Sequence, residues 1–311
     1  MRPPAIAVLA IGLLSGCIDY EYAERTVTDV FTQIVDERRT DVLLVIDNSA
    51  SMGEEQALLA ENFAAFTDVL MGATSDFRVG VITTDPGDGG ALRDDWLDAD
   101  TPELDLAFQE AVQVGTRGSR DEQGLAMALY ALDSDINPGF LRGEAALHVV
   151  FFADEDDHSS GDPEYYLNEY RRLSGTGGFA THAIVGDLPD GCVSGTVAAD
   201  PGERYLAAAY LSAGHRDSIC ARDYEDVLGR VGLSVTGLLD RFPLSQLPEP
   251  ETLVVWVDGV VIPEREVDGW TLSLGDNAVV FHGRSVPRPG MTVTVEYEPL
   301  VGTVPGDDTG A

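Results

Sequence analysis

One carboxylate and two hydroxyls stand at alternate positions directly after an apolar segment of the sequence. The apolar segment covers residues 41–46, and the polar side chains belong to Asp47, Ser49 and Ser51. Carboxylate and hydroxyl oxygens are hard ligands, and Mg²⁺ prefers such oxygens in near-octahedral geometry while it keeps several waters. Because serines at alternate positions of a turn can point at one ion, this string predicts half of a metal site.

Two further segments offer the oxygens that this half-site lacks. Ser119 ends a loop over 115–119, just before a helical pattern, and Asp154 follows an apolar strand over 147–153. Thr116 in the same loop is an alternative to Ser119. With only two carboxylates, such a site stays weakly charged and open. A carboxylate from a partner can therefore become the last ligand.

Each of these residues also has a purely structural explanation. Ser51 and Glu54 match the Ser-x-x-Glu capping box, so Ser51 could simply start a helix. Asp47 and Asp154 could accept hydrogen bonds from nearby backbone amides. Asp156 and Asp157 are typical of a solvated acidic turn, with a second cation as the alternative. These explanations do not account for the fact that three separate segments all offer oxygen ligands at positions expected to lie close together.

The elements that must position these residues alternate between apolar strands and amphipathic helices. Strands are predicted over 41–46, 77–83, 147–153 and 179–185. Helices are predicted over 54–71, 121–132, 163–173, 203–212 and 223–239. Strands that are apolar on both faces, separated by helices, indicate a parallel sheet covered on both sides. Ligands of such α/β folds bind at the carboxyl ends of the strands, where Asp47 and Asp154 stand.

The pattern changes after residue 243. A proline-rich linker over 247–250 is followed by short strands and turns, and residues 291–297 alternate cleanly between apolar and polar. We predict a small C-terminal all-β module there. Before the α/β region, residues 26–31 alternate enough to form an edge strand.

The first residues are typical of an export signal. Met1-Arg2 is followed by an apolar run over 5–14 that is too short to span a bilayer. The string Leu14-Ser15-Gly16-Cys17 resembles the bacterial lipobox, which implies cleavage before Cys17 and lipid attachment to its thiol. Ile18 rather than aspartate follows, which favours the outer membrane. The predicted organisation is a lipoprotein signal peptide (1–16), a lipid-anchored linker (17–36), the α/β domain (37–245), the β-module (246–300) and a disordered tail (301–311).

The other two cysteines are predicted to form a disulfide. With Cys17 lipidated, Cys192 and Cys220 remain as a pair in an oxidising compartment. Such a bridge stabilises by about 3–4 kcal/mol in the chain-entropy model. A redox or metal pair is the alternative, but no CxxC spacing or histidine cluster favours it.

The charge of the chain excludes some partners. The 311 residues include 54 acidic and 19 basic ones, all of the latter arginine, for a net charge of −35. Such a surface repels nucleic acid and anionic lipid, so we exclude nucleic-acid binding and expect membrane contact only through a lipid on Cys17.

Together these features resemble the von Willebrand factor type A (vWA) domain and its metal-ion-dependent adhesion site (MIDAS). The Asp-x-Ser-x-Ser motif of that family matches Asp47, Ser49 and Ser51, and its last aspartate matches Asp154. Its loop threonine is replaced by Ser119. The glycine that typically follows the aspartate is Glu155. The resemblance covers about 37–245 and implies a doubly wound, Rossmann-like, mostly parallel sheet. The closer match is to secreted bacterial vWA lipoproteins.

The resemblance implies a protein-binding domain rather than an enzyme. Mg²⁺ or Mn²⁺, or alternatively Ca²⁺, would bind Asp47, Ser49, Ser51, Ser119 and Asp154, and an acidic residue of a partner protein would complete the shell. We find no Gly-x-Ser-x-Gly elbow, His-Glu-x-x-His motif, phosphate loop or dinucleotide fingerprint. A structural envelope lipoprotein with a stabilising metal, and a metal-dependent hydrolase, are the alternatives. The expected location is the bacterial cell envelope.

Overall fold

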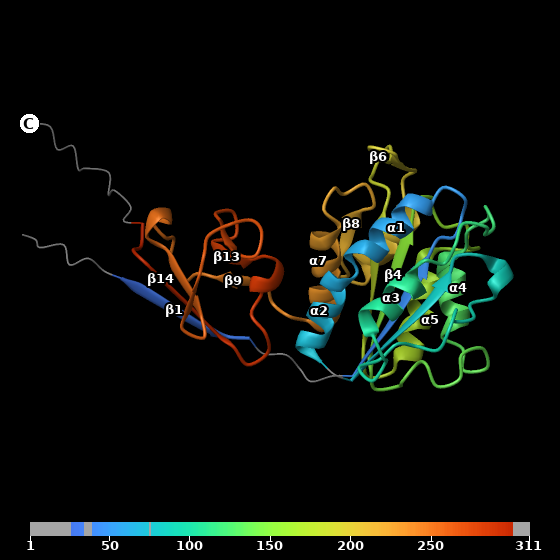
Figure 1. Cartoon of the computed structure of the whole chain (residues 1–311), viewed down its shortest axis with the longest axis horizontal. Helices are drawn as coiled ribbons and strands as arrows, with labels where there is room; N and C mark the ends of the chain where they lie inside the picture. The colour runs from blue at the N-terminus through green and yellow to red at the C-terminus, as the bar shows by residue number, and fades with distance from the viewer. Residues whose placement is uncertain (1–25, 34–38, 75, 301–311) are drawn as a thin grey trace, which may run out of the picture.

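The structure, a computed structural model, consists of two bodies that lie side by side (Figure 1). It describes residues 26–33, 39–74 and 76–300. The predicted signal peptide, Cys17 and the tail from residue 301 lie outside the described residues. Within the described ranges, no helix combines the length and the apolar character needed to cross a membrane. We call residues 39–240 the α/β body, and residues 26–33 together with 241–300 the β body.

A five-stranded, fully parallel sheet forms the centre of the α/β body. Its spatial order is β3-β2-β4-β5-β8. The strands are β2 (Thr40–Ile46), β3 (Phe77–Thr83), β4 (Ala146–Ala153), β5 (Phe179–Val185) and β8 (Arg216–Ser218). In register, Ile46 pairs with Thr83 on one side and Phe152 on the other, so β2 and β4 end together at one edge of the sheet.

Helices cover both faces of this sheet. They are α1 (Gly53–Asn62), α2 (Ala64–Ala73), α3 (Leu104–Val112), α4 (Gly124–Ala131), α5 (Pro163–Ser174), α6 (Glu203–Leu211) and α7 (Tyr224–Thr236). Alternate residues of β2 belong to two separate cores: Leu44 packs with α1, α2, α3 and α7, whereas Leu43 packs with α4, α5 and α6. The predicted doubly wound α/β fold is therefore confirmed.

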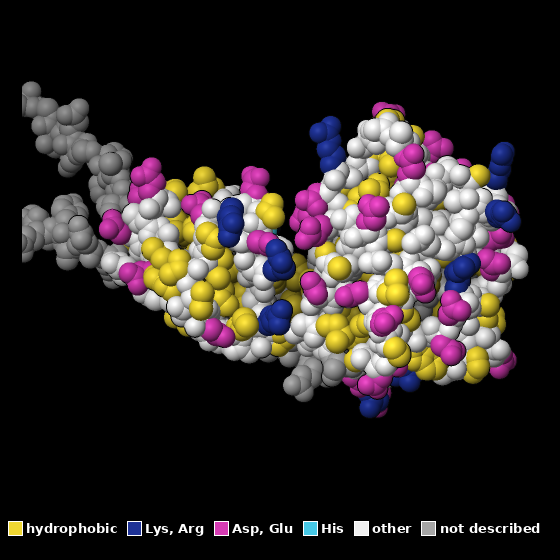
Figure 2. Space-filling model, viewed as in Figure 1, with side chains coloured by type: hydrophobic (Ala, Val, Ile, Leu, Met, Phe, Trp, Pro, Cys, Tyr) yellow, Lys and Arg dark blue, Asp and Glu magenta, His cyan; other side chains and the backbone are white. Residues whose placement is uncertain are grey.

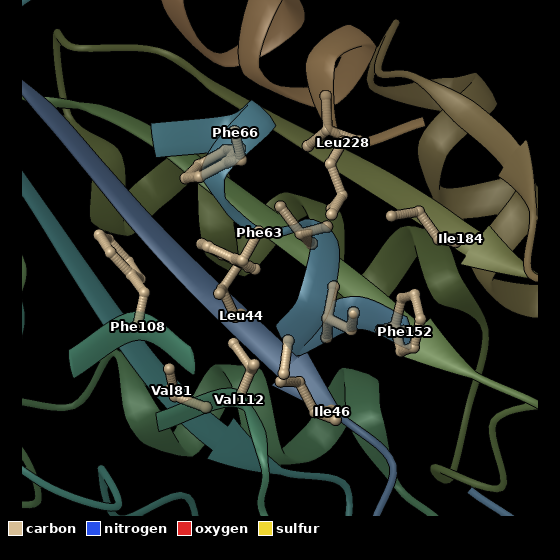
Figure 3. Close-up of a cluster of buried hydrophobic side chains, with 14 of the residues drawn as sticks. Leu44, Ile46, Phe63, Phe66, Val81, Phe108, Val112, Phe152, Ile184 and Leu228 are labelled. Atoms are coloured by element: carbon tan, nitrogen blue, oxygen red, sulfur yellow. The ribbon is translucent and has the colours of Figure 1, made fainter. Parts of the chain in front are cut away.

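Aromatic side chains fill the core under α1, α2, α3 and α7. Figure 3 shows Phe63 and Phe66 pointing from the α1–α2 segment towards Leu44 of β2, with Leu228 of α7 in the same cluster. Phe63 also stacks on Phe108 of α3, with ring centroids 5.0 Å apart. The single helix predicted over 54–71 is in fact two helices that meet at Phe63. This packing fixes the position of α1 behind the loop that carries Asp47.

The β body contains two small antiparallel sheets, of order β1-β14-β10-β11 and β12-β13-β9. The strands are β1 (Val27–Thr32), β9 (Arg241–Pro243), β10 (Val254–Val257), β11 (Val260–Ile262), β12 (Trp270–Ser273), β13 (Ala278–Phe281) and β14 (Thr292–Tyr297). Phe242 of β9 and Phe281 of β13 lie in its core.

Two predicted boundaries need correction. The strand β1 lies in the segment that we predicted to be a linker, yet it pairs with β14 over its whole length, from Val27 with Tyr297 to Thr32 with Thr292. The strand β9 lies in the predicted α/β domain, yet it pairs with β13. The chain thus enters through the β body, forms the α/β body and returns. The α/β body is an insertion into the β body, which is not simply C-terminal.

The fully buried side chain of Gln33 links the end of β1 to the segment by which the chain returns from the α/β body to the β body. Its amide nitrogen donates to the carbonyl oxygen of Leu239, just after α7, at 2.7 Å and to that of Pro287 in the β body at 3.1 Å. Its amide oxygen accepts from the Leu239 N–H at 3.3 Å. One side chain therefore joins the end of β1, the exit from α7 and a loop of the β body.

Candidate metal centre

The loop after β2 turns the oxygens of its polar side chains towards one another. The Asp47 N–H continues the sheet ladder by donating to the carbonyl oxygen of Phe152 at 2.9 Å. One carboxylate oxygen of Asp47 accepts from the Ser49 N–H at 2.6 Å, whereas the other has no hydrogen-bond partner. The hydroxyl oxygens of Ser49 and Ser51 lie 3.0 Å apart. The predicted half-site is therefore assembled as a unit.

Ser51 does not cap the following helix. The helix α1 begins at Gly53, its N-cap residue is Met52, and no side chain caps it. The Ser51 hydroxyl instead hydrogen-bonds the carboxyl group of Asp154. The capping-box explanation of Ser51 is thus wrong, and its oxygen faces the strand ends.

Asp154 stands at the end of β4, beside Asp47. Its side chain is buried, and one carboxylate oxygen has no hydrogen-bond partner. Burial raises its pKa to about 7. The hydrogen bond from Ser51 lowers this pKa, and the neighbouring Asp47 and Glu55 raise it. Two acidic groups from adjacent strands therefore meet in a place that water barely reaches.

A third carboxyl group, which the sequence did not lead us to expect, joins this pair. Glu122 lies in the loop before α4, its side chain is 0% exposed, and neither of its carboxylate oxygens has a hydrogen-bond partner. Burial raises its pKa to about 10, and its contact with Asp47 and the charges of Glu155 and Asp154 add to this. Glu122 therefore belongs to the site.

Backbone hydrogen bonds on both sides fix Glu122 in place. Its carbonyl oxygen accepts from the His158 N–H at 2.7 Å, and the next N–H, of Gln123, donates to the carbonyl oxygen of Thr84 at 2.9 Å. Gly124 then approaches Tyr205 so closely that a Cβ atom there would lie 2.3 Å from the phenol oxygen. The helix α4 therefore starts at Gly124 and not at the predicted residue 121, which leaves Glu122 in the loop.

Glu55, on the first turn of α1, adds a fourth buried acid. One of its carboxylate oxygens has no partner, and burial raises its pKa, with Glu54 and Asp47 adding to the rise. No ion pair found in the described ranges involves Asp47, Glu55, Glu122 or Asp154. No cationic side chain of the described residues therefore pairs with the acids at this edge of the sheet.

The two predicted loop ligands lie nearby in different surroundings. The Ser119 hydroxyl accepts from the Asp121 N–H at 3.0 Å, and the Ser119 N–H donates to Asp85 at 2.9 Å. Thr116 is exposed, and its methyl group lies 3.7 Å from the position of a Cβ atom on Gly53. Neither hydroxyl hydrogen-bonds Asp47 or Asp154 among the described residues. Both remain predictions as ligands.

The acidic turn after Asp154 is structural. Asp157 is buried; it accepts from the Leu125 N–H of α4 at 3.0 Å and pairs with Arg204 at 3.0 Å. Asp156 accepts from the Arg204 N–H at 2.9 Å. The turn is therefore neither solvated nor short of partners, and Asp157 holds the N-terminus of α4, next to Glu122.

The chemistry of these donors fits a divalent cation. In the described part of the chain, no three His, Cys, Asp or Glu side chains already stand at metal-ligand spacing. The argument for a cation rests instead on the carboxylate oxygens of Asp47, Glu122 and Asp154, which are buried without partners. Buried charges in proteins are paired or bind metals, and oxygens of this kind suit Mg²⁺, Mn²⁺ or Ca²⁺.

A pocket of about 470 Å³ adjoins these strand ends. Ser51 and Asp154 form its inner wall. Its outer wall is the hairpin of β6 (Cys192–Ser194) and β7 (Val197–Ala199), which the disulfide from Cys192 to Cys220 fastens to the α/β body. The predicted disulfide is therefore present. The pocket gives a partner access to the edge of the candidate site.

Comparison with known proteins gives structural likenesses only. No family model and no curated protein matches the sequence. The pilus adhesin SpaC from Lactobacillus rhamnosus GG, in its open conformation, matches with a TM-score of 0.48 and 13% identity over 88% of this chain and 40% of the adhesin. A von Willebrand factor type A protein from Catenulispora acidiphila matches with a TM-score of 0.41 and 14% identity, over 90% of this chain and 66% of that protein.

Proximal thread matrix protein 1 from the mussel byssus matches with a TM-score of 0.44 and 10% identity, over 70% of this chain and 52% of that protein. This chain thus spans less than two thirds of each of these three structures. The fold assignment rests on the topology itself. The parallel order β3-β2-β4-β5-β8, with helices on both faces, fits the doubly wound, vWA-like α/β fold that the sequence predicted.

Proposed function

We propose that this chain is a divalent-cation-dependent protein-binding domain of the bacterial cell envelope. The observation that supports it most is the group of buried carboxyl groups of Asp47, Glu122 and Asp154, each with at least one oxygen that lacks a hydrogen-bond partner. Burying these acids together is unfavourable unless a cation compensates them. Buried acids that destabilise the fold, beside an open pocket, suit a binding role better than a role in fold stability alone.

The proposed cation is Mg²⁺ or Mn²⁺, with Ca²⁺ as the alternative. Asp47 and Asp154 would hold it with their carboxylates, and Ser49 and Ser51 with their hydroxyls. Thr116 or Ser119 remains the candidate for a hydroxyl from the loop before α4. When bound, the cation supplies positive charge and open coordination positions at the edge of the pocket. We assign no catalytic residue.

The proposed location rests on the predicted lipobox at Cys17 and on the disulfide. A lipid on Cys17 would anchor the protein, in the outer membrane rather than the inner one. The Cys192–Cys220 disulfide supports an oxidising compartment, because such bridges are rare in the cytosol. The chain would then enter the β body a few residues after its anchor, since β1 begins at Val27.

Calorimetric titration with Mg²⁺, Mn²⁺ and Ca²⁺ tests the cation site. We expect one equivalent of cation to bind the parent protein. Asp154→Asn should bind at least about tenfold more weakly, a difference of about 1.4 kcal/mol, because a ligand charge is lost. Asp100→Asn, which makes the same change at an exposed position, is the control. No heat of binding in the parent would refute the site.

Selection from a random peptide library, displayed on phage, separates binding from a structural role. We expect peptides that enrich on the immobilised protein in Mg²⁺ to be released by a chelator, and not to enrich on Asp154→Asn. Cation binding without any chelator-sensitive peptide would favour the alternative, a structural envelope protein whose metal stabilises the fold.

A further inference from the structure

The four-stranded sheet of the β body has one face outside the core of that body. The side chains of Val293 and Val295 in β14, and of Val255 and Val257 in β10, are buried in the core. Because successive residues of a strand point to opposite faces, the residues between them lie on the outer face of the sheet. Figure 2 shows hydrophobic side chains gathered on the β body in the region where Figure 1 labels β1 and β14.

One row of residues crosses this outer face without a charge. Thr294 of β14 pairs with Val30 of β1 on one side and with Trp256 of β10 on the other, and Trp256 pairs with Val261 of β11. Val30 is 60% exposed and Val261 is 58% exposed, so both ends of the row are open. Within the four described strands, Glu296 is the one ionisable residue on this face.

The composition of this face suits a layer of lipid headgroups. Tryptophan is enriched where membranes meet water, because its ring is apolar and its N–H is polar. Trp256 lies between Thr294 and Val261 in the row, and part of its side chain is exposed. Although the chain has a net charge of −35, a zwitterionic bilayer does not repel a face that carries one carboxylate.

A second copy of the chain fits this face less well. Two copies would bring together two chains of net charge −35, which repel each other. A stable interface between proteins buries about 1,200–2,000 Å² in total, and one narrow row of side chains falls short of that area. The face therefore suits a contact that a tether holds in place better than it suits a dimer in solution.

The predicted lipid on Cys17 would be such a tether. Val27, where β1 begins, is the tenth residue after Cys17. A stretch of this length spans at most about 35 Å when fully extended, so the sheet would stay close to the bilayer. A short tether raises the effective concentration of a weak contact to about the millimolar range. An apolar row too weak to hold a free protein on a membrane can therefore hold a tethered one.

We propose that the outer face of the sheet β1-β14-β10-β11 lies on a zwitterionic phospholipid surface, with Val30, Trp256 and Val261 at the interface. This rests on the proposed function, since it assumes the lipid on Cys17. It modifies the expectation that this lipid makes the only contact with the membrane. Because Gln33 joins the end of β1 to the exit from α7, a β body held on the bilayer also limits the orientations of the α/β body.

Quenching of tryptophan fluorescence by brominated lipids tests the contact. The mature chain is coupled through the Cys17 thiol to a maleimide lipid in phosphatidylcholine vesicles, since the other two cysteines form a disulfide. We expect brominated phosphatidylcholine to quench the parent, and this quenching to be lost in Trp256→Phe. Trp96→Phe, which removes a tryptophan of the α/β body that stacks under Arg78, should leave the amount of quenched fluorescence unchanged.

A charge placed in the row tests which face makes the contact. Val30→Glu should reduce the quenching to the level of Trp256→Phe, because moving a carboxylate out of water into an apolar layer is unfavourable. Val267→Glu makes the same change at a residue that is 68% exposed and lies outside the four strands, so it should keep the quenching of the parent. Thermal unfolding of both variants checks that they are folded.

Two results would overturn the inference: equal quenching in the parent and Trp256→Phe, or quenching that persists in Val30→Glu. Self-association of the uncoupled protein that Val30→Glu abolishes, measured by sedimentation, would assign the face to a second copy and would overturn it as well. The lipid itself is tested separately, by mass spectrometry of Cys17 in protein from bacterial membranes. A free thiol there refutes the anchor of the proposed function, whereas the maleimide lipid supplies its own tether, so the two failures are distinguishable.

Discussion

Asp47, Glu122 and Asp154 are buried acids, and each has at least one carboxylate oxygen that lacks a hydrogen-bond partner. Burial raises the pKa of Glu122 and of Asp154, and the neighbouring Asp47 adds to both rises. A divalent cation reverses this balance, because it favours the ionised form of every carboxyl group that it contacts. The same residues are therefore unfavourable without the cation and favourable with it.

Two histidines form a second buried polar group, far from these acids along their strands. His148 Nδ1 and His182 Nε2 lie 3.0 Å apart, and their rings stack. Since the His215 N–H donates to His182 Nδ1 at 3.1 Å, His182 carries its proton on Nε2 and donates it to His148. Burial lowers the pKa of His148 to about 4 and that of His182 well below its usual value. His215 in turn pairs with Asp217, which also holds Arg230.

The contribution of the two histidines to the free energy of unfolding should therefore fall as the pH drops below 6.5. A histidine whose pKa is lower in the folded state binds its proton more readily when unfolded, so acid favours unfolding. For His148 alone the loss is about 3 kcal/mol between pH 7 and pH 4. Urea unfolding of parent and His148→Asn over this range measures it, because the contributions of the acids cancel in the difference.

The control for this comparison is His158→Asn, since His158 is half exposed and only 3.7 Å from the exposed Asp121. It should not reproduce the change in pH dependence that His148→Asn causes. Parallel curves for parent and His148→Asn would contradict the assignment of the pH dependence to the buried histidine pair.

At the scale of single residues, the sequence predicted the site residues that local spacing reveals. It missed the one that only burial in the folded protein reveals. Asp47, Ser49 and Ser51 are neighbours in the chain, and Asp154 ends the adjacent strand, so a parallel sheet brings them together. Glu122 looked like one of many surface acids in a chain of net charge −35. Its signal was its place, two residues before the glycine that opens the wholly apolar helix α4.

Among the elements, one side chain of α1 fixes the loop after β2 to the loop before α4. The buried Gln56 donates to the carbonyl oxygens of Asp47 and Gly115, both at 2.9 Å, and accepts from the Gly115 N–H at 3.1 Å. Two loops of the candidate site thus share one amide group. Gln56 positions the site without contacting the proposed cation.

Gln56→Ala should lower both stability and cation affinity. It leaves buried carbonyl and N–H groups without partners, at a cost of about 1–3 kcal/mol for each group that water cannot reach. Urea unfolding measures the stability and calorimetric titration the affinity for Mg²⁺. Gln113→Ala, at an exposed position with a single local hydrogen bond, should change neither by more than about 0.5 kcal/mol. An unchanged affinity in Gln56→Ala would contradict the positioning role.

The sequence predicted which segments form helices and which form strands, but it did not predict where some of them begin. The strand β5 occupies the predicted residues 179–185, because its mostly apolar sequence, with the last five residues buried, suits a strand inside a covered parallel sheet. The helix α4 starts later than its apolar pattern, because Gly124 must fit against Tyr205, which lies far away in the sequence. Such contacts between distant segments decide where a helix begins, and periodicity does not contain them.

At the scale of the whole molecule, the β body is held together by contacts between residues 26–33 and residues 241–300. The Tyr297 hydroxyl donates to the Asp29 carboxylate at 2.8 Å, and Phe31 packs on Phe242 with ring centroids 5.4 Å apart. The sequence predicted a strand at residues 26–31 but not its partner, because pairing across most of the chain leaves no local signal. On the face in view, acidic side chains are spread over both bodies (Figure 2).

Gln33→Ala should loosen the junction between the bodies. It removes hydrogen bonds to Leu239 and Pro287 from a fully buried position, at a cost of about 1–3 kcal/mol for each group left unpaired. Hydrogen exchange should accelerate in residues 237–241 and 287–291. Thr32→Ala, its exposed neighbour in β1, is the matched control. Equal exchange in both variants would contradict a junction held by Gln33.

The most direct test of the account is an anomalous diffraction map from crystals of the protein soaked with Mn²⁺. We expect one strong peak at the carboxyl ends of β2 and β4, in contact with Asp47 and Asp154, and its loss in crystals of Asp47→Asn. The absence of any peak at these strand ends would contradict the cation site altogether.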